Sequence, residues 1–309
     1  MITTVTLNTS VDRRYILKDI CKDEIFRCED YSYTPGGKGI NVSRVLNQLN
    51  VKLTCLGFVG GFSGGFIEEQ LKLLKIDTNF TKINGETRTC IGIIFEDGSQ
   101  SEILEKGPEI SKKEIDDFIE KYKAALEKSK IITISGSIPK GVSSDIYRHL
   151  IELANKMDVK VILDTSGYSL IDGIKASPYL IKPNKDELEA ITKIKINSNN
   201  DIIRACKDLM NMGAKNIAVS LGKDGMIFFG NEGKFKVRIP KIKVLNTVGS
   251  GDSTVAGFAL GLLKKSDIED ILKLANACGI SNAMEKETGK INVSIVKDLI
   301  DSIEVFDIS

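Results

Sequence analysis

The sequence has few of the residues on which nucleophilic hydrolases, zinc proteins and disulfide-rich proteins depend. His149 is the only histidine among 309 residues, and it lies in a helical pattern without a nucleophile motif nearby, so no Ser-His-Asp or Cys-His system is expected. The six cysteines are scattered and form no Cys-x-x-Cys pair, which argues against a cysteine-based zinc site and a disulfide framework. They are typical of small apolar residues in a reducing cytosol.

The chain also lacks a long apolar run and an excess of one charge. No run is long enough to span a bilayer, and residues 1–8 resemble a buried strand rather than a signal peptide. Lys and Arg number 43 against 42 Asp and Glu, a formal net charge of +1, so the composition gives no sign of nucleic-acid binding. We therefore expect a cytoplasmic globular protein that acts on a small molecule, with neither nucleic acid nor membrane as a partner.

Two common phosphate-binding motifs are missing as well. The P-loop pattern Gly-x-x-x-x-Gly-Lys-[Ser/Thr] is absent, and so is the dinucleotide fingerprint Gly-x-Gly-x-x-Gly. Their absence argues against a P-loop NTPase and against a dinucleotide-binding oxidoreductase. The chain has instead two other glycine-rich segments, Pro35–Val42 and Asn246–Ser253, and each leads into a helical apolar pattern.

The segment at 246–253 predicts an anion site with a general base beside it. A tight Gly249-Ser250-Gly251 turn that opens a helix directs backbone N–H groups and the helix dipole at one point. Asp252 follows directly, and a carboxylate beside a bound phosphate is suited to take the proton of an attacking hydroxyl. The alternative is a plain helix start with Asp252 in its first turn.

The segment at 35–42 suits an anionic ligand that carries hydroxyl groups. Its glycines allow a ligand to approach the backbone closely. Lys38 brings a point charge suited to phosphate, and Asn41 can both donate to and accept from hydroxyls. The alternative is a glycine-rich turn with a solvated lysine.

Short apolar runs alternate with helical patterns along most of the chain. This alternation predicts an α/β fold with a mostly parallel sheet covered by helices on both faces, in which both glycine-rich helix starts lie at the carboxyl ends of strands. The expected strands are Thr3–Leu7, Leu53–Val59, Ile131–Ser135, Val159–Asp164, Leu180–Lys182 and Ile217–Leu221. The expected helices are Gly39–Leu49, Gly64–Leu74, Lys112–Glu127, Ser144–Lys156, Lys185–Ile191, Asn200–Met212, Ser253–Leu263, Ile268–Met284 and Val293–Asp301.

Residues 12–33 and 87–105 break this alternation, because they resemble extended strands without helices between them. A turn at Glu96–Ser99 indicates a hairpin within the second segment. We expect these strands to form a small side sheet that acts as a lid over the site. Such a thin sheet cannot cover its own apolar face, so we predict a homodimer that joins the lids of two subunits.

Three further polar positions follow expected strands. Asn184 and Glu187 form an Asn-x-x-Glu pattern that suits a helix cap, and equally suits residues that order a phosphate–magnesium assembly. Ser220–Gly225 offers backbone donors for a nucleotide, or is an ordinary hairpin turn. Asp12 follows the first strand, where a lone aspartate is usually a turn former.

Taken together, these motifs resemble those of the ribokinase-like sugar kinases, also called the PfkB family. Gly36–Asn41 is similar to the family's N-terminal signature and Asn246–Asp252 to its C-terminal signature, with the Asn184-x-x-Glu187 pattern between them. The resemblance covers essentially the whole chain. It implies one kinase domain over residues 1–309, folded as a ribokinase-like three-layer α/β/α sandwich with a mostly parallel central sheet and a small β-sheet lid.

Carried across position by position, the resemblance implies a role for each site residue. Asp252 is the implied catalytic base, and the backbone of Gly249, Ser250 and Gly251 is the implied anion hole. The implied sugar-phosphate contacts are Asp12, Gly37, Lys38, Asn41, Arg88 and Ser137. The implied nucleotide-side residues are Lys182, Asn184, Ser220, Gly222 and Asn276, and Glu187 is the implied acid that orders Mg²⁺ beside ATP.

Within the family, the chain is similar to the branch that phosphorylates ketohexose phosphates to 1,6-bisphosphates. Segments 6–12, 85–88, 102–108 and 135–141 carry this similarity. Tagatose 6-phosphate is the expected substrate and fructose 1-phosphate the alternative, while an unphosphorylated sugar or nucleoside is a more remote one because Lys38 and Arg88 suit an anionic substrate. A non-catalytic nucleotide sensor would have no use for Asp252 at an anion hole.

Two positions depart from the family pattern. Many relatives carry Asp where this chain has Asn246 and Thr where it has Val248, and in ribokinase-type members that Asp helps to bind a monovalent cation. Asn246 removes the charge, which puts potassium activation of this chain in doubt.

Overall fold

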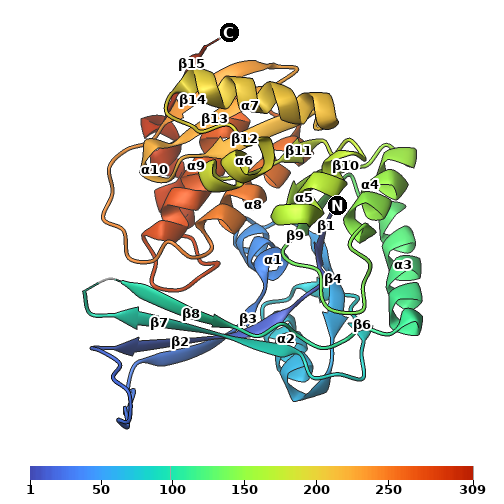
Figure 1. Cartoon of the computed structure of the whole chain (residues 1–309), viewed down its shortest axis with the longest axis vertical. Coiled ribbons are helices and arrows are strands. Elements are labelled where there is room, and N and C mark those ends of the chain that lie inside the picture. Colours follow the sequence, from blue (N-terminus) through green and yellow to red (C-terminus); the bar gives the residue numbers. More distant parts are fainter. Residues whose placement is uncertain (98, 309) are drawn as a thin grey trace.

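A computed structural model describes residues 1–97 and 99–308 of the chain. Within them, an eleven-stranded sheet has the strand order β15-β14-β13-β12-β11-β10-β9-β1-β4-β5, with β6 also paired to β4 (Figure 1). The strands are β1 (Ile2–Thr6), β4 (Leu53–Val59), β5 (Asp77–Thr78), β6 (Thr81–Lys82), β9 (Ile131–Ser135), β10 (Lys160–Asp164), β11 (Leu180–Ile181), β12 (Asn216–Ser220), β13 (Met226–Gly230), β14 (Gly233–Arg238) and β15 (Glu304–Asp307). In this spatial order, each neighbouring pair from β5 through β4, β1, β9, β10 and β11 to β12 is parallel. The pairs β12–β13, β13–β14 and β14–β15 are antiparallel.

Helices cover both faces of this central sheet, as the alternating pattern predicts. They are α1 (Lys38–Gln48), α2 (Gly61–Leu73), α3 (Lys112–Leu126), α4 (Ile146–Lys156), α5 (Gly167–Ile174), α6 (Lys185–Thr192), α7 (Asn199–Met212), α8 (Ser250–Lys264), α9 (Ile268–Ala283) and α10 (Val293–Ser302). One apolar cluster joins the sheet to α1, α2, α8, α9 and α10, and a second joins it to α3–α7. Neighbouring strand residues alternate between the two, as Ile131 and Ile132 do, because successive side chains of a strand point to opposite faces.

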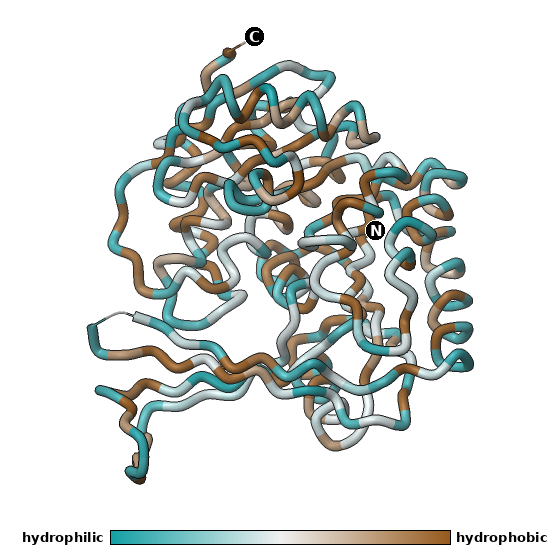
Figure 2. The backbone as a smooth tube through the Cα atoms, viewed as in Figure 1, coloured by the Kyte–Doolittle hydropathy of each residue, from teal (hydrophilic) through white to brown (hydrophobic). Residues whose placement is uncertain are grey.

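Burial on both faces explains why the inner strands are continuously apolar. All residues of β1 and β9 are buried. Figure 2 shows the corresponding hydrophobic stretches running through the interior of the sandwich. Gly257 on α8 serves the same close packing, because a Cβ there would lie 2.5 Å from the Cα of Ala275 on α9.

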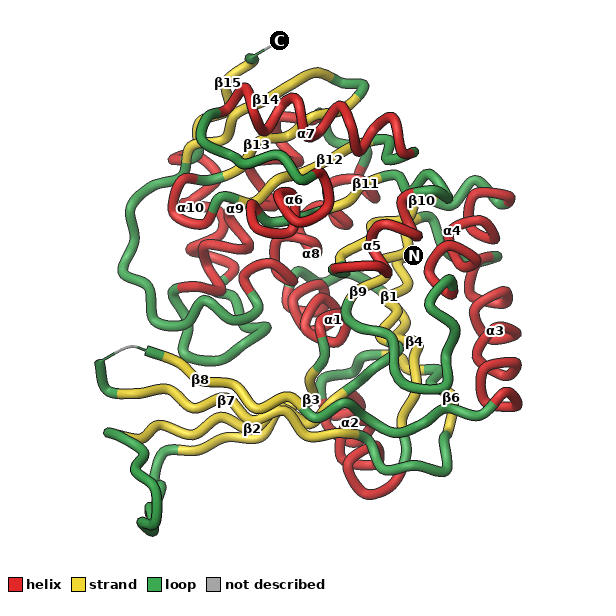
Figure 3. The backbone as a smooth tube through the Cα atoms, viewed as in Figure 1, coloured by secondary structure: helices red, strands yellow, loops and turns green. Residues whose placement is uncertain are grey.

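A separate four-stranded sheet, here called the small sheet, extends from one side of the sandwich (Figure 3). Its order is β3-β2-β7-β8, formed by β2 (Ser10–Leu17), β3 (Tyr31–Gly36), β7 (Arg88–Phe95) and β8 (Gln100–Leu104). The strands overlap the two segments predicted for the lid, but β2 begins two residues earlier, at Ser10, and β3 continues to Gly36. Asp12 lies within β2 rather than in a turn, and the β7–β8 hairpin is confirmed. Residues 18–30 between β2 and β3 are a connection without further strands.

Several sequence-based boundaries need correction. The helix expected at 253 begins at Ser250, which places Gly251 and Asp252 inside its first turn. Helix α5 and strand β15 were not predicted, because segments of eight and four residues are too short to show a recognisable hydrophobic periodicity. The turn at 220–225 joins the antiparallel strands β12 and β13, so the hairpin interpretation is right.

Candidate active site

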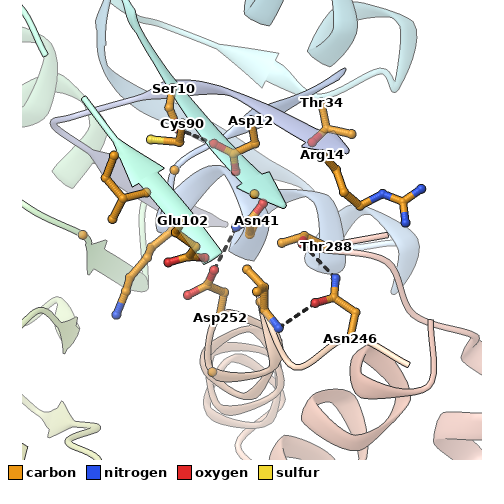
Figure 4. A pocket seen from close by; sticks show the side chains of 18 of the residues that line it. Ser10, Asp12, Arg14, Thr34, Asn41, Cys90, Glu102, Asn246, Asp252 and Thr288 are labelled. Atoms are coloured by element: carbon orange, nitrogen blue, oxygen red, sulfur yellow. Dashed lines mark hydrogen bonds between the residues drawn. The ribbon is translucent and has the colours of Figure 1, made fainter. Parts of the chain in front are cut away.

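A cavity of about 610 Å³ lies where the small sheet meets the carboxyl ends of the parallel strands (Figure 4). It brings together most of the site residues predicted from sequence. These are Asp12, Gly37, Lys38, Asn41, Arg88, Ser137, Lys182, Asn184, Glu187, Ser220, Gly249, Gly251 and Asp252. Residues from positions 12 to 252 thus converge on one space, although the roles given to them remain predictions.

The start of α8 has the geometry expected of an anion site. Gly249 has φ of 83°, in the left-handed region that favours glycine, and no side chain caps the helix that follows. Helices α3, α6 and α7 begin with a capping box that engages one first-turn N–H, whereas α1, α2, α4, α5 and α9 also lack a side-chain cap. The start of α8 bears on the site because Gly249, Gly251 and Asp252 line the cavity. An uncapped helix start that lines a cavity leaves N–H donors for a bound anion. The N–H of Ser250 is the exception, because it already donates to the carbonyl of Thr247 (3.2 Å).

Asp252 is placed to act as a base. Its side chain is 6% exposed, and its Oδ2 accepts a hydrogen bond of 2.9 Å from Asn41 Nδ2 on α1. Burial raises the pKa of Asp252 to about 6, with nearby Asp164 adding to the rise and Lys38 opposing it. At neutral pH the carboxylate is therefore largely ionised, yet basic enough to accept a proton efficiently.

Asp164, which the sequence analysis missed, organises the two lysines of the site. Its Oδ2 lies 3.4 Å from Lys38 Nζ and its Oδ1 3.3 Å from Lys182 Nζ. Burial alone would raise the pKa of Asp164, but the two ammonium groups hold it below its usual value. A signal was present in the sequence, because Asp164 ends a predicted buried strand at the sheet edge where ligands bind.

The same ion pairs bring positive charge to the start of α8. A Cβ on Gly251 would lie 3.2 Å from Lys182 Nζ, so this lysine borders the helix N-terminus. Asp164 also raises the pKa of Lys38 above its ordinary value, which keeps Lys38 charged. The Lys38 side chain is 44% exposed and lines the cavity. Its charge therefore remains within reach of an anionic ligand.

The small sheet contributes an acid and a guanidinium at its base. Ser10 Oγ donates to Asp12 Oδ1 (2.6 Å), and burial raises the pKa of Asp12. Arg88 donates to the carbonyls of Glu105 (2.9 Å) and Asn8 (3.1 Å), while its buried Nε has no partner within the described residues. Two carbonyls thus fix Arg88 and leave donor capacity for a ligand.

Of the residues predicted to contact the nucleotide, only some line this cavity. Lys182, Asn184 and Ser220 line the cavity, whereas Gly222 lines a neighbouring hollow of about 880 Å³. Asn276 lines neither, because it is buried on α9 and its Nδ2 donates to the carbonyl of Leu272 (2.8 Å).

Asn184 and Glu187 form the capping box that the sequence offered as one interpretation. Glu187 N donates to Asn184 Oδ1 (2.8 Å), and Glu187 Oε2 accepts from Asn184 N (2.9 Å). Both residues also line the cavity, so capping does not remove them from the site.

The donor set suits magnesium that arrives with phosphate oxygens. In residues 1–97 and 99–308 no three His, Cys, Asp or Glu side chains group as metal ligands. Glu187 on the cavity wall, whose Oε1 is not used in the cap, fits an ion held by a few carboxylates, waters and phosphates.

Other cavity residues carry no role predicted from sequence, and Asn246 and Val248 were noted only as departures from the family pattern. The polar ones include Asn8, Ser10, Thr34, Cys90, Glu102, Asp164 and Thr288. His149 lies in a helix, as its sequence pattern predicts, and is exposed, and the described cysteines are all free. None of the described helices is both long and apolar enough to pass through a membrane.

An acid at an uncapped helix start, with lysines held beside it, is the arrangement of a phosphoryl-transfer enzyme. The chain belongs to the pfkB family of carbohydrate kinases, whose sequence profile matches residues 5–293. A tagatose-6-phosphate kinase of Staphylococcus epidermidis is 42% identical over 314 aligned positions, covering all of both chains. The resemblance inferred from the two signatures is confirmed.

Solved structures agree with this assignment. A protein described as a possible 1-phosphofructokinase from Thermotoga maritima has a TM-score of 0.91 and 28% identity, with 100% of this chain and 99% of that one covered. Phosphofructokinase-2 from Escherichia coli, solved in complex with potassium, has a TM-score of 0.90 and 27% identity, with 97% and 98% covered. The ribokinase-like fold is therefore confirmed.

Proposed function

We propose that this chain transfers the γ-phosphoryl group of ATP to a ketohexose phosphate and forms a 1,6-bisphosphate, with tagatose 6-phosphate as the acceptor. The observation that carries the proposal is the buried Asp252 carboxylate in the open first turn of α8, on the same cavity as Lys38 and Arg88. The whole-length identity of 42% to a tagatose-6-phosphate kinase supports this choice of acceptor.

In this reaction, Asp252 takes the proton of the free primary hydroxyl as that oxygen bonds to the γ-phosphorus. The bond between the γ-phosphorus and the bridging oxygen breaks, and ADP leaves with the electron pair. The first-turn N–H groups of α8 other than that of Ser250, together with the ammonium of Lys182, stabilise charge on the phosphoryl oxygens. Magnesium, when bound beside Glu187 and the phosphates, neutralises part of the remaining negative charge.

Lys38 and Arg88 distinguish a phosphorylated acceptor from a neutral sugar. A neutral sugar or nucleoside would offer neither cation an anionic group, whereas a phosphate ester can form charge-assisted hydrogen bonds with both. Fructose 1-phosphate is the second candidate, because the overall fold is also similar to that of a possible 1-phosphofructokinase.

A direct substrate test separates these acceptors. The purified chain is incubated with ATP and Mg²⁺ and with tagatose 6-phosphate, fructose 6-phosphate, fructose 1-phosphate, free ketohexose or a nucleoside. Products are identified by mass spectrometry. We expect the highest kcat/KM with tagatose 6-phosphate. A preference for fructose 1-phosphate would select the alternative, and turnover restricted to neutral acceptors would refute the role of Lys38 and Arg88.

We further place the reaction in the cytoplasm, where ATP is available, and propose that the chain is a homodimer joined through the small sheet. The small sheet carries exposed apolar side chains that a second copy would cover. On one face of the sheet these are Tyr31 (53% exposed), Tyr33 (46%) and Ile103 (56%).

A further inference from the structure

The loop before α8 is held by the side chain of Asn246, which is 2% exposed. Its Nδ2 donates to Thr288 Oγ1 (3.2 Å; Figure 4) and to the carbonyl of Lys286 (3.2 Å), and its Oδ1 accepts from Val248 N (3.0 Å). A backbone N–H can only donate and a carbonyl can only accept, so the orientation of the amide is fixed by its partners.

The 286–289 loop that Asn246 contacts is tied to the site from two other elements. Asn282 on α9 donates to the carbonyl of Val248 (2.9 Å) and accepts from Gly289 N (2.9 Å). Arg44 on α1 donates to the carbonyl of Thr288 (2.8 Å). These bonds join α1, α9 and the loop that leads into α8, so they position the helix start that carries Gly249 and Asp252.

The arrangement does not fit a monovalent cation at this point. A relative solved in complex with potassium shows that such an ion occurs in the family. In this chain, however, the two N–H groups of Asn246 are directed at the Lys286 carbonyl and Thr288 Oγ1. A cation bound to the same two oxygens would face the positive ends of both N–H dipoles.

We propose that the amide of Asn246 takes the place of a monovalent cation in this chain and makes the positioning of the α8 start independent of potassium. The inference rests on the proposed kinase reaction for its kinetic readout only, and thermal unfolding provides a readout that needs no substrate.

The conservative substitution Asn246→Asp tests the idea, because it changes two donors into one further acceptor. The new carboxylate oxygen would then face the Lys286 carbonyl oxygen with no donor between them, and the Thr288 hydroxyl could offset only part of the buried negative charge, which a cation would stabilise. At equal ionic strength, wild-type kcat and Tm are expected to be the same in potassium and in tetramethylammonium chloride. For the variant in tetramethylammonium we expect kcat to fall by roughly tenfold or more, the scale of a lost buried hydrogen bond. Potassium should restore much of its kcat and raise its Tm.

Two controls separate this effect from simple loss of stability. Asn246→Ala removes the amide without adding a carboxylate, so it should lose kcat and Tm without rescue by potassium. Asn216→Asp is matched in chemistry and burial, because Asn216 is 5% exposed and donates to the Tyr179 carbonyl (2.8 Å). Asn216 is the first residue of β12, at the strand end opposite the site. It should lose Tm equally in both salts.

Wild-type kcat or Tm that rises specifically with potassium would overturn the inference, and so would an Asn246→Asp variant indifferent to potassium. The wild-type arms remain decisive even where the variant fails to fold. Absence of kinase activity with every acceptor would refute the proposed function instead, while the Tm comparison would still decide the role of Asn246.

Discussion

The central sheet and the small sheet place their strands in opposite environments. Every residue of β1 and β9 is buried between two helical layers, whereas all five residues of β8 are exposed. The buried acids Asp164 and Asp252 lie on the sandwich side of the cavity. The small sheet contributes Asp12 and Arg88 at its base, where Ser10 pairs with both Gly36 and Arg88.

This difference suggests a division of labour. A base with a shifted pKa and a preorganised anion site require burial and fixed neighbours, which two helical layers supply. A sheet that is open on one face can contact substrate and a second subunit but contributes less desolvation. We therefore expect changes on the sandwich side to act on kcat, and changes in the small sheet to act on KM or on association.

The largest effect is expected on the sandwich side, from Asp252→Asn. Loss of the base should lower kcat by roughly 100-fold or more and leave both KM values nearly unchanged. Steady-state kinetics and circular dichroism of the folded variant check this. Asp208→Asn, at an exposed position on α7, is the matched control and should keep full activity. A well-folded, fully active Asp252→Asn enzyme would contradict the assignment.

A strong but different effect is expected in the small sheet, from Arg88→Ala. The KM for the sugar phosphate should rise by about 10- to 150-fold, corresponding to a charge-assisted contact worth about 1.5–3 kcal/mol. The KM for ATP should change little. Arg148→Ala on α4, where the guanidinium pairs with Asp145 just before α4 and with Asp172 on α5, serves as the control. Equal changes in the KM for the sugar phosphate and the KM for ATP would contradict the proposal that Arg88 in the small sheet binds the sugar phosphate specifically.

The burial of Asp252 should also cost stability in a pH-dependent way. Because its pKa in the folded state is raised to about 6 from 3.8, the folded protein binds this proton more tightly than the unfolded chain. Binding of this proton therefore favours the folded state: its contribution to the unfolding free energy is fully present below pH about 4 and is lost as the pH rises through about 6. Asp252→Asn should therefore gain up to about 3 kcal/mol of unfolding free energy relative to wild type at pH 8, and less at pH 4. Denaturant unfolding at the two pH values measures the difference, and an equal difference at both would contradict it.

The smallest effect on turnover is expected from Ile103→Asp in β8. A charge on this 56% exposed apolar side chain should weaken the proposed dimer while leaving kcat nearly unchanged. Sedimentation velocity at micromolar concentration compares it with wild type and with Met157→Asp, a 46% exposed position after α4. A wild-type protein that is strictly monomeric would refute the dimer and leave the kinase chemistry untouched.

Local sequence determined most of the secondary structure and the two glycine-rich helix starts. Leu53–Val59 and Ile131–Ser135 have the predicted bounds, because a buried strand needs an unbroken apolar run. Gly249 marks its helix start because the backbone there has positive φ. These features depend on neighbouring residues in the chain, so a single sequence contains the information.

Only the tertiary structure decided which polar groups meet. Asp164 holds Lys38 across 126 residues, and Asn41 donates to Asp252 across 211. Asn276, matched to the nucleotide side by resemblance, instead satisfies its amide within α9. In the sequence, Asn246 indicated only the loss of a carboxylate relative to many family members. In the fold, its amide donates to the Lys286 carbonyl and to Thr288 Oγ1. Such partners depend on how distant elements pack. The hydrophobic periodicity of one segment does not predict which polar group of another segment will contact it.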